Sequence, residues 1–476
     1  MMGRLSDDQG KFFYDFDLDE QVPADHVLRR IDAVLDLGWL HGELRPHYSH
    51  TGRPSVDPEL MIRMLLIGYC FGIRSERRLC SEVHLNLAYR WFCRLGLEDP
   101  VPDHSTFSVN RHGRFRESGL LRSVFEDVVR RCMAAGLVGG EGFAIDASVL
   151  EAEASRYQGL PGDEAIDWTD PKRDTRAARE YLAALDPEPD KHRSRPKQIS
   201  PSDPCAAWTA KADKRAQFAY GLNYLVDNDH AIIVDVEATP GRTYDEVAAT
   251  RTLIERTEVR LGLKPDRLAA DTAYGTGRML GWLQEQEIEP HIPVWDNSRR
   301  KDGTFSRADF TYDKQRDRYT CPGGKVLKTT GRIHADDTWR YMASTGDCRV
   351  CPLKDRCCPN TTLRRVTRDR HEDARDHARS LVDTETYKAS RNERKKVEML
   401  FAHLKRHMGF RRLRLRGFSG ANDEFLLAAT AQNLKRLAKH AWKPPPPVPK
   451  AARTMPNQRN RQPKPKTAAA SASGGE

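Results

Sequence analysis

The spacing of apolar residues predicts helices over the first part of the chain. Apolar side chains recur at helical spacing in residues 60–73, and Asp57 followed by proline is a typical helix start. A second helix is expected over residues 76–95, and Asp103 precedes a third. The pattern therefore predicts an all-helical N-terminal domain over residues 10–139.

The pattern changes to alternating strands and helices over residues 140–295. Residues 142–149 alternate apolar and small side chains around Asp146, which is typical of a buried strand. Two further apolar runs predict a hairpin that turns at residues 227–229. After a helix, a short strand ends at Asp271, in the position where open α/β sheets build their sites. We expect a mixed sheet flanked by helices.

Three other segments interrupt or follow this core. A polar insertion, residues 156–207, contains one predicted helix, and a cysteine-rich insertion spans residues 296–380. Residues 381–442 return to helical spacing, with a last amphipathic helix over residues 423–440. The tail, residues 443–476, is basic and rich in proline, so it is expected to be disordered.

The charge of the chain is concentrated in two places. The 476 residues carry a net charge of +10, from 78 Lys and Arg against 68 Asp and Glu. Residues 391–416 hold ten basic residues against two acidic ones, and the tail holds seven against one. Such clustering is what binding to double-stranded DNA requires. The longest apolar run is too short to cross a membrane, so we expect a cytoplasmic protein associated with the nucleoid.

Three acidic residues stand out as candidate metal ligands. Asp146 lies within a predicted strand, Asp271 at the end of another, and Glu398 in a basic helix. In that helix Arg391, Arg394, Glu398 and Lys405 would share one face. Carboxylates suit Mg²⁺, and two such ions can promote phosphodiester cleavage. Two rival acids remain: Asp235, which we expect to be structural, and Asp245, which is more typical of a helix start.

In these motifs the chain resembles the insertion-sequence transposases of the DDE class, and most closely the insertion-sequence group eleven-eighty-two. The signature of that family is Tyr, Arg, the catalytic Glu and Lys at fixed spacing. Arg394, Glu398 and Lys405 match it, whereas Arg391 stands where the family has Tyr. The last helix, with Asn433, also resembles the family.

This resemblance implies an RNase H-like α/β core in which Asp146, Asp271 and Glu398 are catalytic and bind two Mg²⁺ ions. It implies cleavage of DNA at transposon ends followed by strand transfer into target DNA, by a protein that is at least a homodimer on DNA. The basic residues that would contact DNA are Arg391, Arg394, Lys405, Arg411, Arg412 and Arg416.

Five cysteines in the insertion have the spacing of a zinc site. Cys348 and Cys351 are separated by two residues, and Cys321 in a Pro-Gly turn and Cys357 would complete a four-thiolate structural Zn²⁺ site. Cys358 is an alternative to Cys357. Since 26 residues separate Cys321 from Cys348, a pair of strands is expected between them.

Several alternatives stay open from the sequence. The protein could be a catalytically inactive, domesticated DNA-binding protein that uses the helical and zinc modules. The three acids could instead belong to an RNase H-like scaffold without activity, or to a nuclease acting on hybrids. The N-terminal helices could bind the terminal repeats, mediate dimerisation, or only pack.

Overall fold

The computed structural model describes most of the chain up to residue 442. The described residues are 16–49, 51, 55–162, 164, 166–168, 170–185, 196–210, 215–296 and 300–442. Residues 1–441 form one compact unit and residues 442–476 a second, of which only Trp442 is described. The tail that we predicted to be disordered therefore lies outside the described residues.

The N-terminal part is helical, as the pattern predicts. Asp57 caps α4 by accepting a hydrogen bond from the Glu59 amide (2.7 Å), with Pro58 in the first turn, and Asp103 caps α7. The helices are α1 (Leu18–Gln21), α2 (Val27–Asp32), α3 (Leu40–Leu44), the 3-10 helix η2 (Arg45–His47), α4 (Pro58–Phe71), α5 (Glu76–Leu85), α6 (Leu87–Phe92), α7 (His104–His112), α8 (Arg114–Glu117) and α9 (Leu120–Ala134).

The prediction of a single helix over residues 76–95 is wrong. The chain forms α5 and α6 because Asn86 between them has an extended backbone. Its side-chain oxygen accepts a hydrogen bond from the Tyr89 amide (3.2 Å), so Asn86 starts a new helix.

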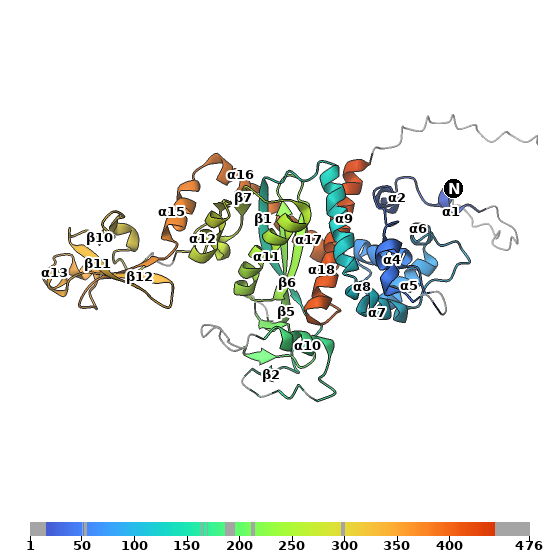
Figure 1. Ribbon diagram of the computed structural model, residues 1–476, viewed down its shortest axis with the longest axis horizontal. Helices are drawn as coiled ribbons and strands as arrows, with labels where there is room; N and C mark the ends of the chain where they lie inside the picture. Colours follow the sequence, from blue (N-terminus) through green and yellow to red (C-terminus); the bar gives the residue numbers. More distant parts are fainter. Residues whose placement is uncertain are drawn as a thin grey trace, which may run out of the picture. The chain divides into compact units, whose positions relative to one another are not determined.

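A mixed sheet carries two of the candidate acids. Its strands are β1 (Gly142–Glu151), β4 (Ala207–Thr209), β5 (Gln217–Asp227), β6 (Ile233–Pro240), β7 (Arg267–Ala269) and β8 (Glu289–His291), in the order β4-β5-β1-β7-β8, with β6 also paired to β5 (Figure 1). β1, β5 and β6 are antiparallel, and β7 and β8 run parallel to β1. The predicted hairpin of β5 and β6 is confirmed.

Helices connect and cover these strands. α11 (Thr243–Leu261) joins β6 to β7, and the 3-10 helix η3 (Thr272–Tyr274) and α12 (Gly277–Glu285) join β7 to β8. The polar insertion forms the two-stranded sheet of β2 (Leu160–Pro161) and β3 (Gln198–Ile199), with α10 (Arg176–Ala183) between them.

The cysteine-rich insertion forms a second sheet with its own core. Its strands are β9 (Thr311–Asp313), β10 (Arg318–Thr320), β11 (Val326–Ile333), β12 (Thr338–Met342) and β13 (Arg365–Asp369), accompanied by η4 (Arg307–Asp309), α13 (Thr345–Arg349) and α14 (Lys354–Cys357). The pair of strands expected between Cys321 and Cys348 is confirmed as β11 and β12. Tyr319, Leu327 and Tyr341 lie at the centre of this separate core.

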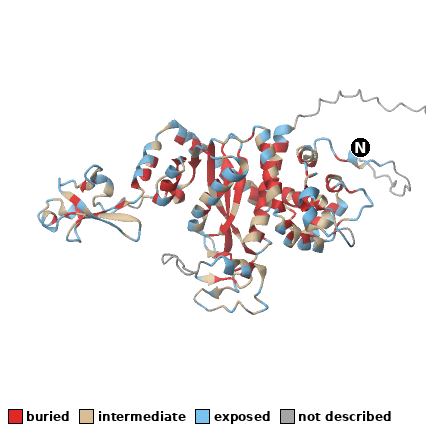
Figure 2. Cartoon of the chain, in the orientation of Figure 1, coloured by how far each residue is buried: buried red, intermediate tan, exposed pale blue. Residues whose placement is uncertain are grey.

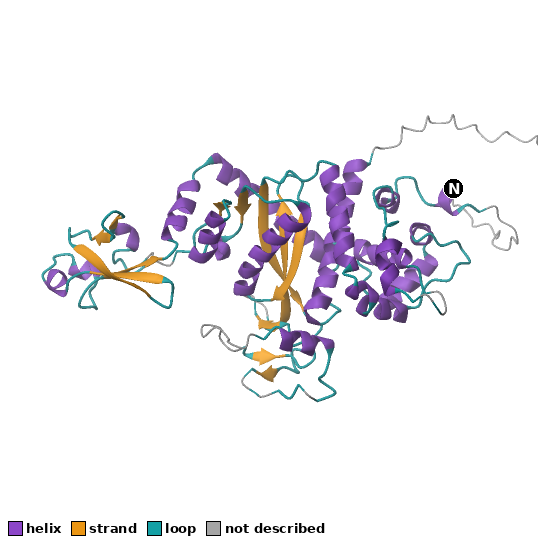
Figure 3. Cartoon of the chain, in the orientation of Figure 1, coloured by secondary structure: helices purple, strands orange, loops and turns teal. Residues whose placement is uncertain are grey.

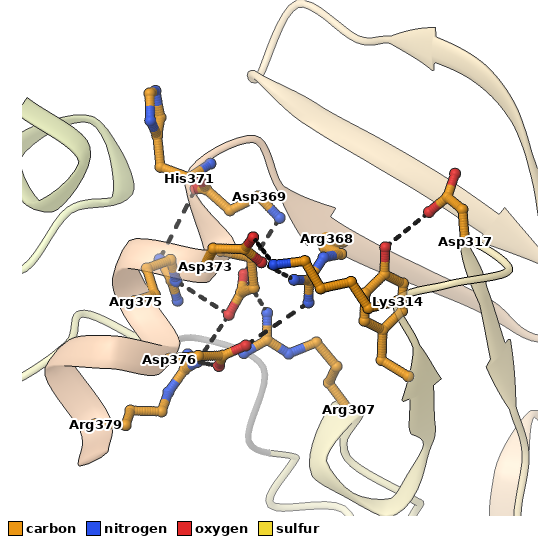
Figure 4. A network of polar contacts seen from close by, with 12 residues as sticks. Arg307, Lys314, Asp317, Arg368, Asp369, His371, Asp373, Arg375, Asp376 and Arg379 are labelled. Atoms are coloured by element: carbon orange, nitrogen blue, oxygen red, sulfur yellow. Dashed lines mark hydrogen bonds and ion pairs between the residues drawn. The ribbon is translucent and has the colours of Figure 1, made fainter. Parts of the chain in front are cut away.

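A charged network joins this sheet to α15 (Glu372–Leu381), as Figure 4 shows. Glu372 is only 2% exposed and forms ion pairs with Arg307 (2.6 Å) and Arg379 (2.8 Å). Arg368 of β13 pairs with Asp373 (2.7 Å). The Glu372 carboxylate is buried, but it is paired with two guanidinium groups. The junction therefore leaves this charge with partners.

The C-terminal helices complete the main core. They are α16 (Glu385–Glu393), α17 (Lys395–Arg406) and α18 (Gly417–Ala441) (Figure 3). α18 starts earlier than the predicted residue 423. Glycines occupy its first turn because Gly420 packs against Leu415, where an added Cβ would lie 2.8 Å from the Leu415 Cβ. α18 packs against α4, α9 and β6.

One apolar core includes the N-terminal helices, the mixed sheet and the C-terminal helices. Figure 2 shows the buried residues along the strands and on the helix faces around them. Asn433 of α18 is fully buried, and it accepts a hydrogen bond from the Ile233 amide (3.0 Å) and donates one to the Ile233 carbonyl (2.8 Å). The Asn433 side chain therefore satisfies the backbone amide and carbonyl of Ile233, at the start of β6, as a neighbouring strand would.

Candidate active site

The middle of β1 carries Asp146. Its side chain is 18% exposed, and Oδ1 accepts a hydrogen bond from the Ala147 amide (2.8 Å). The strand is buried on either side of this position, so the carboxylate is held by a rigid element. The predicted strand is confirmed and extends to Glu151.

Asp271 lies beside Asp146. Ala144 of β1 pairs with Ala269 of the parallel strand β7, and each Asp is two residues beyond this pair. Equivalent positions on neighbouring parallel strands are about 5 Å apart in the backbone and face the same side. Asp271 also starts η3, because its Oδ1 accepts a hydrogen bond from the Ala273 amide (2.8 Å).

Glu398 is linked to Asp146 through Arg394. The Arg394 guanidinium lies 3.2 Å from Asp146 Oδ2 and 3.0 Å from Glu398 Oε1. Glu398 stands in the first turn of α17 and is 56% exposed, so its carboxylate is open to solvent. The structure thus brings all three predicted acids to one face of the sheet.

The predicted basic helix is interrupted at Arg394, which is a correction. Arg391 belongs to α16, whereas Glu398 and Lys405 belong to α17, so the four residues do not share one helical face. Both helices contact β1, and α16 also reaches β8. There Ser390 of α16 contacts His291 (2.7 Å between Oγ and Nδ1).

The electrostatics of the site favour a cation. Burial raises the pKa of Asp146, and the neighbouring Asp271 and Glu398 raise it further, while the Ala147 amide and Arg394 oppose this. Three carboxylates with one guanidinium leave a local excess of negative charge. Such a set of oxygen donors fits a divalent cation.

The side chains of Asp146, Asp271 and Glu398 are not arranged as a metal centre in this structure. Among the described residues, no three His, Cys, Asp or Glu side chains lie close enough together to hold a metal ion. In the main site the Arg394 guanidinium lies between Asp146 and Glu398, in contact with the oxygens that would ligate a metal. The residues present therefore fit a divalent cation by their chemistry, provided that Arg394 moves.

Tyr274 is a residue that the sequence interpretation missed. Its phenol oxygen is buried and has no hydrogen-bond partner among the described residues. Burial raises its pKa well above the usual value, and Asp146, Glu246 and Asp271 add to this increase, so the phenol faces carboxylates. An aromatic residue in the polar turn directly after Asp271 was the signal in the sequence.

The predicted DNA-contacting residues fall into two groups. Arg391 and Arg411 are exposed on the surface. Lys405 instead donates to Ser148 Oγ (2.6 Å) and the Val149 carbonyl (3.3 Å), which holds it against β1. Ser148 was also missed, although its position two residues after Asp146 places it on the same face of the strand.

The side chains of Arg412 and Arg416 lie near the end of β1 in space. Arg412 pairs with Glu153 (3.2 Å) and lies 3.7 Å from Glu151. Arg416 donates to the Glu153 carbonyl (3.0 Å). Together with Arg411 they form a basic strip that leads away from the carboxylates.

The rival acids lie elsewhere. Asp235 is 2% exposed and forms ion pairs with Arg122 and Arg256, the latter at 2.7 Å, so it is a structural acid, as expected. Asp245 lies in the first turn of α11, where an acidic side chain is favourable.

The five cysteines of the insertion line one small cavity. The Cys321 sulfur accepts a hydrogen bond from the Lys325 amide (3.3 Å), and Cys358 lies 3.8 Å from the Lys354 ammonium. Burial raises the pKa of Cys357 to about 11. Thiols from three chain segments around one apolar cavity fit a structural zinc ion by their chemistry.

Two family models match the chain. The Transposase domain (DUF772) matches residues 16–113, and the Transposase DDE domain matches residues 320–438, which include Glu398, the five cysteines of the insertion and strands β11 to β13. The chain belongs to the insertion-sequence DDE transposases. Proteins of this family act on DNA, in agreement with the basic residues that flank Glu398.

The transposase has no close counterpart among solved structures: none matches at a significant level. The two matched segments contain neither Asp146 nor Asp271, so the place of these residues rests on the strand register alone. Within the part of the chain that the structure describes, no helix has the length and apolar character needed to cross a membrane.

Proposed function

We propose that this transposase cleaves DNA at the ends of an insertion sequence and transfers the freed strands into target DNA. The observation that carries the proposal is that Asp146 of β1 and Asp271, two residues after the end of β7, lie close enough for their charges to interact, with Glu398 bound to the same guanidinium as Asp146. The order β6-β5-β1-β7-β8, with three antiparallel and two parallel strands, supports an RNase H-like core. The closer kinship to group eleven-eighty-two stays a prediction, since Arg391 replaces the Tyr of its signature.

Asp146, Asp271 and Glu398 would hold two Mg²⁺ ions in this proposal. When bound, these ions supply activation of the attacking oxygen and stabilisation of the leaving oxygen. The aspartates come from a sheet and are fixed, whereas exposed Glu398 adjusts to complete the site. Arg394 is the shared counter-ion of Asp146 and Glu398 without metal, and it would be free to contact a DNA phosphate once cations occupy the site.

Other side chains position the strand. Lys405 is held beside Asp146 by Ser148, so its ammonium is prepared to contact the phosphate next to the scissile bond. Arg391, Arg411, Arg412 and Arg416 would bind neighbouring phosphates, which sets register without reading sequence. The buried phenol of Tyr274 would act as a positioning residue by donating to one of the adjacent carboxylates. Two element ends must be cleaved together, so we propose a homodimer on DNA.

The experiment is metal-dependent cleavage of a duplex that carries the element end, taken from the inverted repeats that flank the coding region. Asp146→Asn, Asp271→Asn and Glu398→Gln should each abolish cleavage and strand transfer while DNA binding is retained. Glu393→Gln is the matched control, because Glu393 lies on the adjacent helix α16 and should be dispensable. Wild-type protein that binds the ends but stays inert with Mg²⁺ and Mn²⁺ would instead identify an inactive, domesticated DNA-binding protein.

We further propose that the cysteine-rich sheet holds one structural Zn²⁺ through Cys321, Cys348, Cys351 and Cys357, with Cys358 as the alternative fourth ligand. The shared cavity supports this assignment. All four positions would be thiolates, which leaves no place for water and indicates a structural rather than catalytic metal.

A further inference from the structure

An open cleft of about 760 Å³ lies at the far end of β1 from Asp146. It is lined mainly by α10 with its N-cap and by the loop between α17 and α18, together with Glu153, His112 of α7 and Ser202. Four arginines face it, namely Arg176, Arg179, Arg414 and Arg416, and the one carboxylate in its lining is Glu153. Glu153 pairs with Arg412 (3.2 Å) and Arg176 with Glu180 (3.4 Å), so the positive charge that the cleft offers comes chiefly from Arg179, Arg414 and Arg416.

The walls of the cleft are fixed by buried contacts. The Glu424 carboxylate, 2% exposed, accepts hydrogen bonds from the amides of Arg414 (2.6 Å) and Leu415 (2.7 Å). Arg176 donates to the Arg416 carbonyl (2.6 Å) and to Ser419. These contacts use the backbone of the loop and leave the Arg414 side chain exposed at the surface.

The charges around the cleft favour the binding of an anion. His112 lies in the wall, and its pKa is lowered to about 4 by burial and by the nearby Arg176, Arg116 and Arg111. Arg179 has a loose partner, Asp174 at 3.7 Å, with both side chains more than half exposed. Thr175, Arg176 and Ala177 at the N-terminus of α10, the end of a helix that favours anions, also line this space.

We propose that this cleft binds the phosphate backbone of the DNA duplex that leaves the active site. The inference rests on the proposed function, because the basic strip of Arg411, Arg412 and Arg416 connects the two places. Glu153 is seven positions after Asp146, which in a strand corresponds to about 23 Å. At 3.4 Å per base pair, the cleft would hold phosphates roughly seven base pairs from the scissile bond.

The test is DNA binding by the full-length protein as a function of salt, with a mixed-sequence duplex of about 40 base pairs as the probe. In the double variant Arg179→Gln, Arg414→Gln, affinity should fall on the order of tenfold. The slope of log Kd against log salt should fall by roughly 2, since two phosphate contacts are lost. Replacement of both residues by Lys should keep the slope, because the charge is retained.

The matched control is Lys314→Gln, Arg316→Gln. Both side chains are at least 70% exposed and lie away from the cleft, where Lys314 pairs with Asp373 of α15 and Arg316 with Asp313 of β9. This control should bind like wild type. A cleft variant with the affinity and slope of the control, or a wild-type protein that does not bind the duplex, overturns the proposal. Loss of the cleft contact is distinct from failure of the proposed chemistry, because Asp146→Asn should abolish cleavage yet keep the full salt slope.

Discussion

Arg394 and Asp146 are 248 residues apart in the chain and form an ion pair at 3.2 Å. The same guanidinium binds Glu398, so a basic residue of the family signature serves as the counter-ion of two predicted metal ligands. The guanidinium therefore offsets part of the negative charge of the site without metal, and cations must compete with Arg394 for the oxygens of Asp146 and Glu398.

Arg394→Ala should make the metal-free protein less stable by about 1 kcal/mol, since the pair is only partly buried. Millimolar Mg²⁺ should stabilise the variant more than wild type, because no guanidinium competes for the oxygens. Urea unfolding with Mg²⁺ and with chelator measures both effects. If Mg²⁺ raises the free energy of unfolding equally in the variant and in wild type, Arg394 does not compete with the metal.

Lys405→Ala should reduce cleavage on the order of a hundredfold, since a positioned cation beside the reacting phosphate is lost. Ser148→Ala should have little effect, because it removes only the resting contact of Lys405. Single-turnover cleavage at saturating protein compares the two. If Ser148→Ala is as damaging as Lys405→Ala, the lysine acts by holding β1 and not by contacting DNA.

Asp203 should make stability depend on pH. It is fully buried beneath the arginine cleft, where Tyr220 donates to Oδ1 (2.6 Å), as does the Gly417 amide (3.1 Å), and burial raises its pKa to about 6. The folded state then binds the proton more tightly than the unfolded state, whose pKa is near 3.8. The contribution to stability is therefore present below pH 3.8 and is lost as pH rises to about 6.

Asp203→Asn removes this titration. The free energy of unfolding of wild type minus that of the variant should decrease by on the order of 2–3 kcal/mol between about pH 4 and pH 7. Urea unfolding at several pH values measures it. A constant difference over this range would mean that Asp203 titrates normally.

Cys321→Ser, Cys348→Ser, Cys351→Ser and Cys357→Ser should each lower the zinc content of purified protein from one ion per chain toward zero. Cys358→Ser should retain the metal, and Cys205→Ser, in a different part of the fold, is the control. Elemental analysis of the metal gives the answer directly. Zinc lost from Cys358→Ser and kept in Cys357→Ser would make Cys358 the fourth ligand, and a metal-free wild type would refute the site.

Local features were predictable from the residues because they depend on neighbours a few positions away. The caps at Asp57 and Asp103, the strand around Asp146 and the turn at Asp271 all follow from side chains that bond to their own local backbone. The amphipathic face of the last helix was also evident, since its spacing alone decides which side is apolar.

Long-range pairing was beyond such reasoning. At the break at Arg394, α16 contacts both β8 and β1 whereas α17 packs on β1, and no local signal marks this division. The cleft at α10 depends on two contacts with the loop between α17 and α18. Glu424 binds a backbone amide of this loop, and Arg176, over 200 residues away in the chain, binds one of its carbonyls.

The residues by themselves determined which chemical groups this transposase has: three acids, a set of basic side chains and a group of thiols, each on an element of predictable type. Only the tertiary structure decided which groups meet. Pairing of Ala144 with Ala269 puts Asp146 next to Asp271, and packing of α17 on β1 brings Arg394 between Asp146 and Glu398. Register and packing are set by the whole core, and a local stretch of sequence does not contain that information.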